Sequence, residues 1–201
     1  MHTAILTFDG YNELDSLIAL GILNRVDMRV SIASPTSRVR SMNGVTLDAM
    51  IDLEEACEAD AVIIGSGART REVVENPAIM KVLRRLDPTR QLLAAQCSGT
   101  LVLAKLGLLT DVPACTDLAS KPWVIAAGVE VLNQPFFART NLATAGGCLA
   151  STYLATWIIA RLHGMEATKD AMHYVAPVGE KEEYIARALR NVTPYLEPVL
   201  S

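Results

Sequence analysis

An abrupt change from strand to helix around residue 97 constrains the fold of this chain more than any other feature of its sequence. Residues 91–95 form an apolar run of strand length. Beyond Ser98 the apolar residues recur with helical spacing, at Leu101, Val102, Leu106 and Leu109. Only Gln96, Cys97 and Ser98 remain to turn the chain, so the sequence predicts a nucleophile elbow with Cys97 at its corner.

Cys97 is therefore the expected nucleophile. Its neighbours two residues away on either side, Ala95 and Gly99, are small, as such a corner requires. The N–H groups after the corner open a helix whose positive end faces the sulfur. We therefore expect Cys97 to be the most reactive thiol, with a pKa below that of a free cysteine. The alternative is that Cys97 is a small buried hydrophobe, as free cysteines often are.

The other three cysteines are predicted to be packing residues. Cys57 and Cys148 fit helix interiors, and Cys115 fits a strand. The spacing of the four cysteines matches neither a disulfide framework nor a zinc site, so no metal is predicted. A reducing, cytoplasmic location is expected.

Strand and helix patterns alternate on both sides of the elbow. Strands are predicted at residues 3–8, 28–33, 60–64 and 91–95, with a small hairpin at 39–47. Helices are predicted at residues 12–23, 73–83 with a break or restart at Pro77, 98–107, 123–127, about 146–163 and 180–189. This alternation predicts a single α/β domain over residues 1–201, with a mostly parallel sheet covered on both faces. The functional site of such a sheet lies at the carboxyl ends of its strands.

Two of these helices are predicted to bury an apolar face. In the first helix the residues expected to face the core are Leu14, Leu17, Ile18 and Ile22. In the long helix they are Leu149, Tyr153, Leu154, Trp157 and Ile158.

Composition narrows the function classes. The formal net charge is −4 and no basic stripe exists, which argues against a nucleic-acid partner. The amino terminus lacks the charged-then-apolar pattern of a signal peptide. The apolar stretch at 143–162 contains glycines and hydroxyl residues, so a buried helix is predicted there and no membrane span. The expected partner is a small-molecule substrate.

Asp15 is the candidate acid. It neighbours Ile18 and Ile22 on its helix, at the margin of the apolar face. A carboxyl group there is desolvated, so its pKa is expected to rise and it could donate a proton near neutrality. The alternative is an exposed carboxylate that complements the helix dipole. Glu13 is the runner-up, because a shift of one residue in helix phase would exchange the two.

The three histidines are expected to be structural or solvated. His2 lies at the terminus, His163 ends the long helix, and His173 lies in the helix after it. A cysteine–histidine relay of the protease kind therefore lacks its base.

Four segments in combination resemble a known family. They are residues 14–15 (Leu-Asp), 64–67 (Ile-Gly-Ser-Gly), 96–99 (Gln-Cys-Ser-Gly) and 142–147 (Leu-Ala-Thr-Ala-Gly-Gly). To roughly residue 175 the chain resembles the ThiJ/PfpI family of the class I glutamine-amidotransferase-like superfamily, and within it the isocyanide hydratases. The resemblance implies a flavodoxin-like three-layer sandwich, a homodimer, and no metal or organic cofactor.

Carried over residue by residue, the resemblance implies that Cys97 is the nucleophile and that Asp15 hydrogen-bonds its sulfur. The N–H groups of Gly67 and Ser98 would form an oxyanion-type pocket.

Two positions depart from the family pattern. Gly65-Ser66-Gly67 replaces the usual Pro-Gly-Gly, and Asp117 occupies the place where many members carry a histidine. Asp117 either hydrogen-bonds substrate or lies in a turn with Thr116.

Three function hypotheses follow. The first is a cofactor-free hydratase or lyase acting on a small electrophilic carbon. In it Cys97 would attack an isocyanide to give a thioimidate, and Asp15 would supply the proton on the way to the N-formamide. The second is glyoxalase- or deglycase-like action on 2-oxoaldehydes, which the missing histidine weakens. The third is a redox-sensing or chaperone-like dimer in which Cys97 is oxidised to a sulfinate without turnover.

Overall fold

The computed structural model describes residues 1–196 and has a six-stranded sheet at its centre. The strands, in spatial order, are β2 (Arg29–Ala33), β1 (His2–Leu6), β5 (Ala61–Ile64), β6 (Leu92–Gln96), β8 (Leu142–Ala145) and β7 (Phe136–Arg139). Every neighbouring pair is parallel except β7 and β8, which are antiparallel at one edge. The mostly parallel sheet predicted from the sequence is confirmed.

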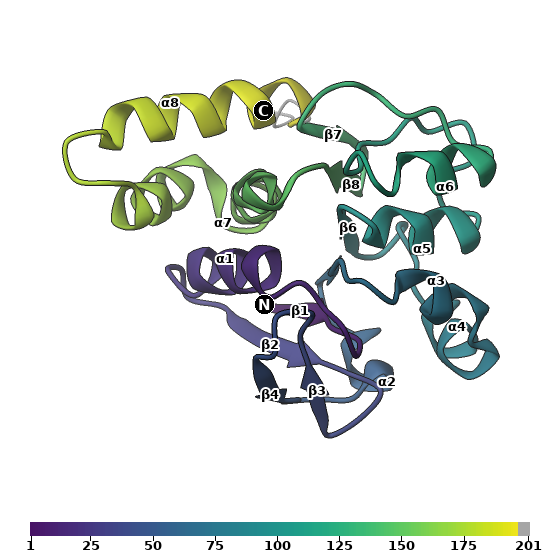
Figure 1. Cartoon of the computed structure of the whole chain (residues 1–201). Coiled ribbons are helices and arrows are strands. Elements are labelled where there is room, and N and C mark those ends of the chain that lie inside the picture. The colour runs from purple at the N-terminus through teal and green to yellow at the C-terminus, as the bar shows by residue number, and fades with distance from the viewer. Residues whose placement is uncertain (197–201) are drawn as a thin grey trace.

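Helices cover both faces of this sheet, so the fold is a three-layer sandwich (Figure 1). One face is covered by α1 (Glu13–Leu23) and α7 (Ser151–Val175), with α8 (Lys181–Val192) packed on α7. The other face is covered by α2 (Leu53–Ala56), α3 (Thr70–Glu75), α4 (Pro77–Leu83), α5 (Gly99–Lys105) and α6 (Lys121–Ala126). The remaining elements are the hairpin β3 (Arg38–Arg40) and β4 (Thr46–Asp48), and the 3-10 helices η1 (Cys148–Ala150) and η2 (Thr193–Tyr195). The flavodoxin-like architecture is confirmed.

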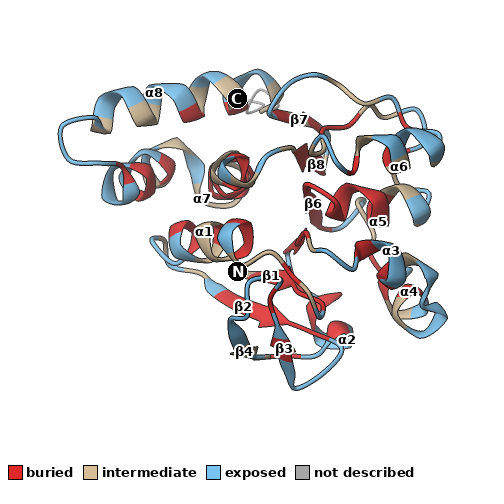
Figure 2. Cartoon of the chain, viewed as in Figure 1, coloured by how far each residue is buried: buried red, intermediate tan, exposed pale blue. Residues whose placement is uncertain are grey.

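A separate hydrophobic core lies on each face of the sheet. Along β5, Val62 and Ile64 enter one core while Ala61 and Ile63 enter the other, because successive strand side chains point to opposite faces. Figure 2 shows the central strands and the inner sides of the helices as buried. Burial on both faces explains why these strands are continuous apolar runs in the sequence.

Local capping sets where the helices begin. The Asn12 side chain accepts a hydrogen bond from the Leu14 N–H and caps α1, at the residue predicted. Asn76 caps α4 in the same way, and Pro77 is the first residue of that helix, where its missing N–H costs nothing. Of the two sequence interpretations of Pro77, the restart of a second helix is the one observed.

One helix is shorter than predicted. The α5 helix ends at Lys105, and Leu106 and Leu109 pack against the core beyond its end. The predicted end of the long helix near His163 is confirmed, because Gly164, with a φ of +84°, departs from helical geometry there. A second helical segment follows this kink to Val175, and the two segments together are α7.

The prediction that Leu14 and Leu149 face the core is wrong. Leu14 is 50% exposed because α1 is rotated so that Asp15, Ala19 and Ile22 face inward. Leu149 is 70% exposed because it lies in η1, before the periodicity of α7 begins.

The strand order places a crevice where the chemistry-bearing residues lie. From β1 the chain moves to β2 on one side and returns to β5 on the other, so β1 and β5 flank the topological switch point. The carboxyl ends of β1, β5, β6 and β8 meet at one edge of the sheet. Cys97 follows β6 directly at this edge.

Within residues 1–196, no helix combines the length and the apolar character needed to cross a membrane.

Candidate active site

Cys97 is the corner between β6 and α5. Its φ is +47°, a left-handed conformation that costs a residue other than glycine roughly 1–2 kcal/mol. Its N–H donates to the carbonyl of Ala145 at 2.8 Å, continuing the pairing of β6 with β8. Its carbonyl accepts from the Thr100 N–H at 3.1 Å and from the Thr116 hydroxyl at 2.7 Å. These hydrogen bonds hold the strained corner in place.

Close backbone contacts around the corner require glycine at positions 67 and 99. A Cβ at Gly99 would lie 2.4 Å from the carbonyl oxygen of Ile64, so α5 can start this close to β5 only without a side chain. A Cβ at Gly67 would lie 2.6 Å from the carbonyl oxygen of Gly10. The glycines of the sequence motifs therefore allow the segments after β1, β5 and β6 to converge.

Asp15 is fully buried beside this corner. Its Oδ2 accepts a hydrogen bond from the Ser66 hydroxyl at 2.5 Å, and its Oδ1 accepts one from the Ser16 hydroxyl at 3.3 Å. A carboxylate oxygen of Asp15 lies within 4.8 Å of the Cys97 Sγ. The structure thus brings together the predicted nucleophile and the predicted acid from segments more than 80 residues apart.

Burial dominates the titration of Asp15. Loss of solvation raises the pKa of its carboxyl group to about 6. The negative charge of Asp117 adds to this rise, whereas the hydrogen bonds from Ser66 and Ser16 favour the ionised form and lower the pKa. A carboxyl group with this pKa exchanges a proton readily near neutrality.

The expectation of a lowered thiol pKa at Cys97 is wrong. Burial is the main cause, and the negative charge of Asp15 the second, of a rise in the pKa of the Cys97 thiol to about 12. The Gln96 amide donates a hydrogen bond to Sγ at 3.2 Å, which opposes this rise only in part. Helix-dipole reasoning from the sequence included neither the burial nor the neighbouring carboxylate. At neutral pH the resting group is a thiol, and it needs a base to become a nucleophile.

Cys97 opens onto a cavity of about 270 Å³, which we call the cysteine cavity. Its wall includes Ser98, Gly67, Asp117, Trp123 and Cys148. Among the described residues, no lysine, arginine or histidine lines it. The absence of histidine from this wall agrees with the sequence interpretation of the three histidines.

The two predicted oxyanion donors differ in their surroundings. The Gly67 N–H donates to the Ser98 hydroxyl oxygen at 3.1 Å, and that oxygen lies 2.7 Å from the Thr70 hydroxyl. The Ser98 N–H precedes α5 and has no partner within the helix. The Ser98 N–H is therefore left without a partner in the helix, whereas the Gly67 N–H would bind a ligand only after the hydroxyl is displaced.

Asp117 and Glu13 do not touch the sulfur. The Asp117 Oδ1 accepts from the N–H groups of Ala119 and Ser120, both at 2.9 Å, which stabilises the turn before α6. The rest of its carboxylate faces the cavity, so Asp117 fits the turn interpretation and remains available to substrate. The pKa of Glu13 lies below its usual value because its own backbone N–H and then the side chains of Asn43 and Ser41 hydrogen-bond its carboxylate.

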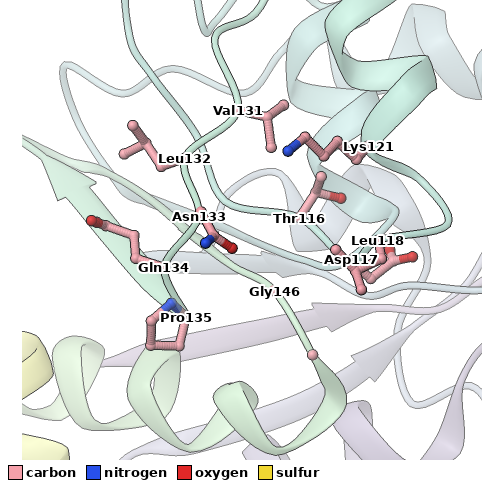
Figure 3. Close-up of a pocket in the computed structure, with 11 residues that line it drawn as sticks. Thr116, Asp117, Leu118, Lys121, Val131, Leu132, Asn133, Gln134, Pro135 and Gly146 are labelled. Carbon is pink, nitrogen blue, oxygen red and sulfur yellow. The ribbon is translucent and has the colours of Figure 1, made fainter.

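A second, larger cavity of about 450 Å³ adjoins the first and shares Asp117 and Gly147 with it. Figure 3 shows its two sides, the segment 131–135 opposite residues 116–118 and Lys121. It carries polar side chains at Lys121, Asn133 and Gln134. This cavity provides room for a substituent larger than the cysteine cavity admits.

Three residues of the site were not assigned a role from the sequence. Ser66, at the departure from the family pattern, binds the Asp15 carboxylate, and Gln96 holds the Cys97 sulfur. Cys148, predicted to pack inside a helix, is half-buried in the short 3-10 segment before α7 and lines the cysteine cavity. Asp15, Cys97 and Cys148 together offer one carboxylate oxygen and two sulfurs within 4.8 Å of one another, a donor set of the kind that zinc accepts.

Comparison with known proteins gives a family match and a set of similar folds. A profile described as the DJ-1/PfpI family matches residues 1–161. No curated protein sequence matches the chain. Schizosaccharomyces pombe DJ-1 superposes with a TM-score of 0.78 at 16% identity, covering 88% of this chain and 100% of that one.

Two further solved structures agree. Drosophila melanogaster DJ-1beta has a TM-score of 0.74 at 21% identity, covering 85% of this chain and 94% of that one. The DJ-1 superfamily protein STM1931 from Salmonella typhimurium has a TM-score of 0.76 at 23% identity, covering 88% of this chain and 98% of that one. At these identities the likeness establishes the fold.

Proposed function

The chain belongs to the DJ-1/PfpI family, and on that premise we propose that it is a cofactor-free hydratase or lyase with Cys97 as its nucleophile. The proposed reaction is addition of water to a small electrophilic carbon, as in the conversion of an isocyanide to an N-formamide. The observation that carries the proposal is the buried Asp15, with a pKa of about 6, within 4.8 Å of the Cys97 sulfur at the end of a cavity.

In the first step Asp15 would act as a base and then as an acid. Ionised Asp15 takes the thiol proton of Cys97 as the sulfur attacks the isocyanide carbon and the S–C bond forms. The same proton then passes from Asp15 to that carbon, which gives a thioimidate. A separation of up to 4.8 Å in the free protein is compatible with this role, because catalytic hydrogen bonds often tighten only when substrate is bound.

In the second step water adds to the thioimidate carbon. The C–S bond then breaks, Cys97 regains its proton, and the N-formamide leaves. The Ser98 N–H, at the start of α5, would donate to charge that develops on the added oxygen.

The charges around the sulfur favour an uncharged substrate. The carboxylates of Asp15 and Asp117 both raise the thiol pKa by their charge, and no cationic side chain lines the described wall of the cysteine cavity. An anionic electrophile such as a 2-oxo acid would be repelled, whereas a neutral isocyanide would not. The second cavity, with Lys121 and Asn133, would receive the substituent.

A panel of electrophiles tests the proposed function. We expect N-formamide formation from a neutral alkyl isocyanide, followed by proton NMR, and little or no consumption of methylglyoxal. Heat-denatured protein serves as the control for uncatalysed addition. Consumption of methylglyoxal to lactate without formamide production would instead support the glyoxalase-like alternative, and no turnover of either would refute the proposed enzyme.

We also propose that the protein is a homodimer in a reducing, cytoplasmic setting, where its cysteines stay free. Leu14 and Leu149 are large exposed apolar side chains on neighbouring elements, α1 and η1. Leu149 borders a hollow of about 500 Å³ that Leu17, Ile18 and Tyr174 also line. Exposed apolar side chains on neighbouring elements are typical of an interaction site, and a second copy would cover them symmetrically.

Replacing Leu149 by glutamate tests the dimer. In a two-fold symmetric dimer the substitution is present in both subunits, so two leucines are lost from the interface. Leu149→Glu is therefore expected to weaken dimerisation roughly tenfold or more. Sedimentation velocity at micromolar concentration measures the change. The matched control is Ile125→Glu, because Ile125 is 51% exposed on α6, on the far side of the molecule from α1 (Figure 1). A monomeric wild-type protein, or equal dissociation in both variants, would contradict the proposed interface.

A further inference from the structure

Cys148 is a second thiol in the cysteine cavity, and the proposed reaction does not use it. It lies directly after Gly146-Gly147, at the start of η1, and is half-buried, whereas Cys57 and Cys115 are fully buried. Its Sγ lies within 4.8 Å of the Cys97 Sγ. Two thiols from positions 97 and 148 therefore face one solvent-accessible space.

We propose that Cys148 is a resolving cysteine for Cys97, so that a hydroperoxide drives formation of a reversible Cys97–Cys148 disulfide. The Cys97 sulfur attacks a peroxide oxygen; an S–O bond forms, the O–O bond breaks, and hydrogen peroxide releases one water. The Cys148 sulfur then attacks the resulting sulfenic acid; the S–S bond forms, the S–O bond breaks, and a second water leaves. Two thiols and one hydrogen peroxide thus give one disulfide and two waters.

The geometry requires only a small movement. A disulfide has its sulfurs about 2.05 Å apart, so these two must approach by less than roughly 3 Å. Rotation about the Cα–Cβ bond of Cys148 moves its sulfur over such a distance. The preceding Gly147 has a φ of +90° and no atom within 4 Å of the position its Cβ would take, but Gly146 before it is packed against the Thr116 backbone, so the movement is assigned to the Cys148 side chain.

Each sulfur has an amide donor of its own. The Gln96 Nε2 donates to the Cys97 Sγ at 3.2 Å and also to the Gly147 carbonyl at 2.9 Å, which links the elbow to the segment before Cys148. The Asn12 Nδ2 donates to the Cys148 Sγ at 3.2 Å. The hydrogen bond from Gln96 favours the thiolate of Cys97, the form that attacks peroxide, and the Asp15 carboxylate lies within 4.8 Å to take the thiol proton.

The disulfide would link oxidant exposure to activity. Because it engages the nucleophile, it stops the proposed hydration as long as it persists. Because it consumes the sulfenic acid, it prevents further oxidation to the sulfinic acid, which most cells do not reverse. A dithiol would restore both thiols.

Mass spectrometry tests this inference without any substrate, so its result does not depend on the proposed hydratase function. Wild-type protein, Cys148→Ser and the control Cys57→Ser would each receive about two equivalents of hydrogen peroxide, the amount that formation of a sulfinic acid consumes, and then N-ethylmaleimide in denaturant. In wild type and in Cys57→Ser we expect a loss of about 2 Da before alkylation and a non-reducing peptide map that joins the Cys97 and Cys148 peptides. In Cys148→Ser we expect a gain of about 32 Da at Cys97, the sulfinic acid.

Reduction completes the test. Dithiothreitol should make Cys97 and Cys148 of wild type alkylatable again, and should leave the oxidised Cys97 of Cys148→Ser unchanged. The inference is overturned by sulfinic acid at Cys97 in wild type with Cys148 still alkylated. It is equally overturned by a disulfide that joins Cys97 to Cys57 or to Cys115.

Discussion

Serine in place of Cys97 is expected to reduce kcat/KM on the preferred isocyanide by roughly four orders of magnitude or more. The hydroxyl fits the space of the thiol, but it holds its proton far more tightly. A neutral hydroxyl is also a far weaker nucleophile than a thiol, and Asp15, with a pKa of about 6, is too weak a base to offset that difference. Steady-state formation of the N-formamide by the variant and by wild type measures the loss.

The fold of this variant should be unchanged. Serine accepts the same left-handed backbone at the corner, and the hydrogen bonds from the residue 97 N–H to Ala145 and from Thr116 to its carbonyl involve only backbone atoms of residue 97. Circular dichroism should match wild type, and Cys57→Ser should retain full activity. Activity above about a tenth of wild type would show that the chemistry does not pass through Cys97.

The elbow could be predicted from the sequence because it is a local feature. A strand that ends at Gln96 and a helix that begins at Gly99 leave only Cys97 and Ser98 to make the turn. The need for glycine at position 99 also follows from local geometry, and the structure adds the reason, a contact with Ile64 from the neighbouring strand.

The surroundings of the elbow could not be predicted in the same way, because they come from distant segments. Ser66 reaches Asp15 across 51 positions, and Cys148 reaches the site from beyond β8. Spacing along the chain contains no signal for either contact.

Helix phase caused the error in α1. The apolar pattern of α1 placed Leu14 inside and Asp15 at the margin, yet the helix turns its carboxyl group inward, where two serines bind it, and leaves the leucine outside. The phase that is less favourable for apolar burial is the one that puts an acid beside Cys97. Such a local conflict is expected at a functional site.

Asparagine in place of Asp15 is expected to lower turnover by roughly two to four orders of magnitude while the nucleophile stays present. Asparagine keeps the shape of the side chain and can hydrogen-bond, but it can neither take the thiol proton of Cys97 nor pass it to the substrate carbon. Formamide production by Asp15→Asn and by the matched variant Glu13→Gln decides the question. Glu13→Gln should stay near wild type, because Glu13 does not line the cysteine cavity.

The pH profile gives this prediction a second readout. The base must be ionised before it can take the thiol proton, so wild-type kcat/KM should rise with pH through about 6 and level off near neutrality. Asp15→Asn should lack this rise over the same range. A wild-type profile that is flat between pH 5 and pH 7 would show that another group takes the thiol proton. Asp117 and Glu13 would then be the next candidates for that base.

Stability separates a catalytic Asp15 from a structural one. Burial raises the pKa of this carboxyl group from 3.8 to about 6, so the folded state binds its proton more tightly than the unfolded state does. Ionised Asp15 therefore costs about 3 kcal/mol of folding free energy at pH 7, a cost that develops as the pH rises from about 4 to about 6. Asparagine avoids this cost, so Asp15→Asn should unfold at a temperature at least as high as wild type at pH 7, with the advantage gone below pH 4. Loss of activity together with a lower unfolding temperature at pH 7 would show instead that Asp15 holds the fold.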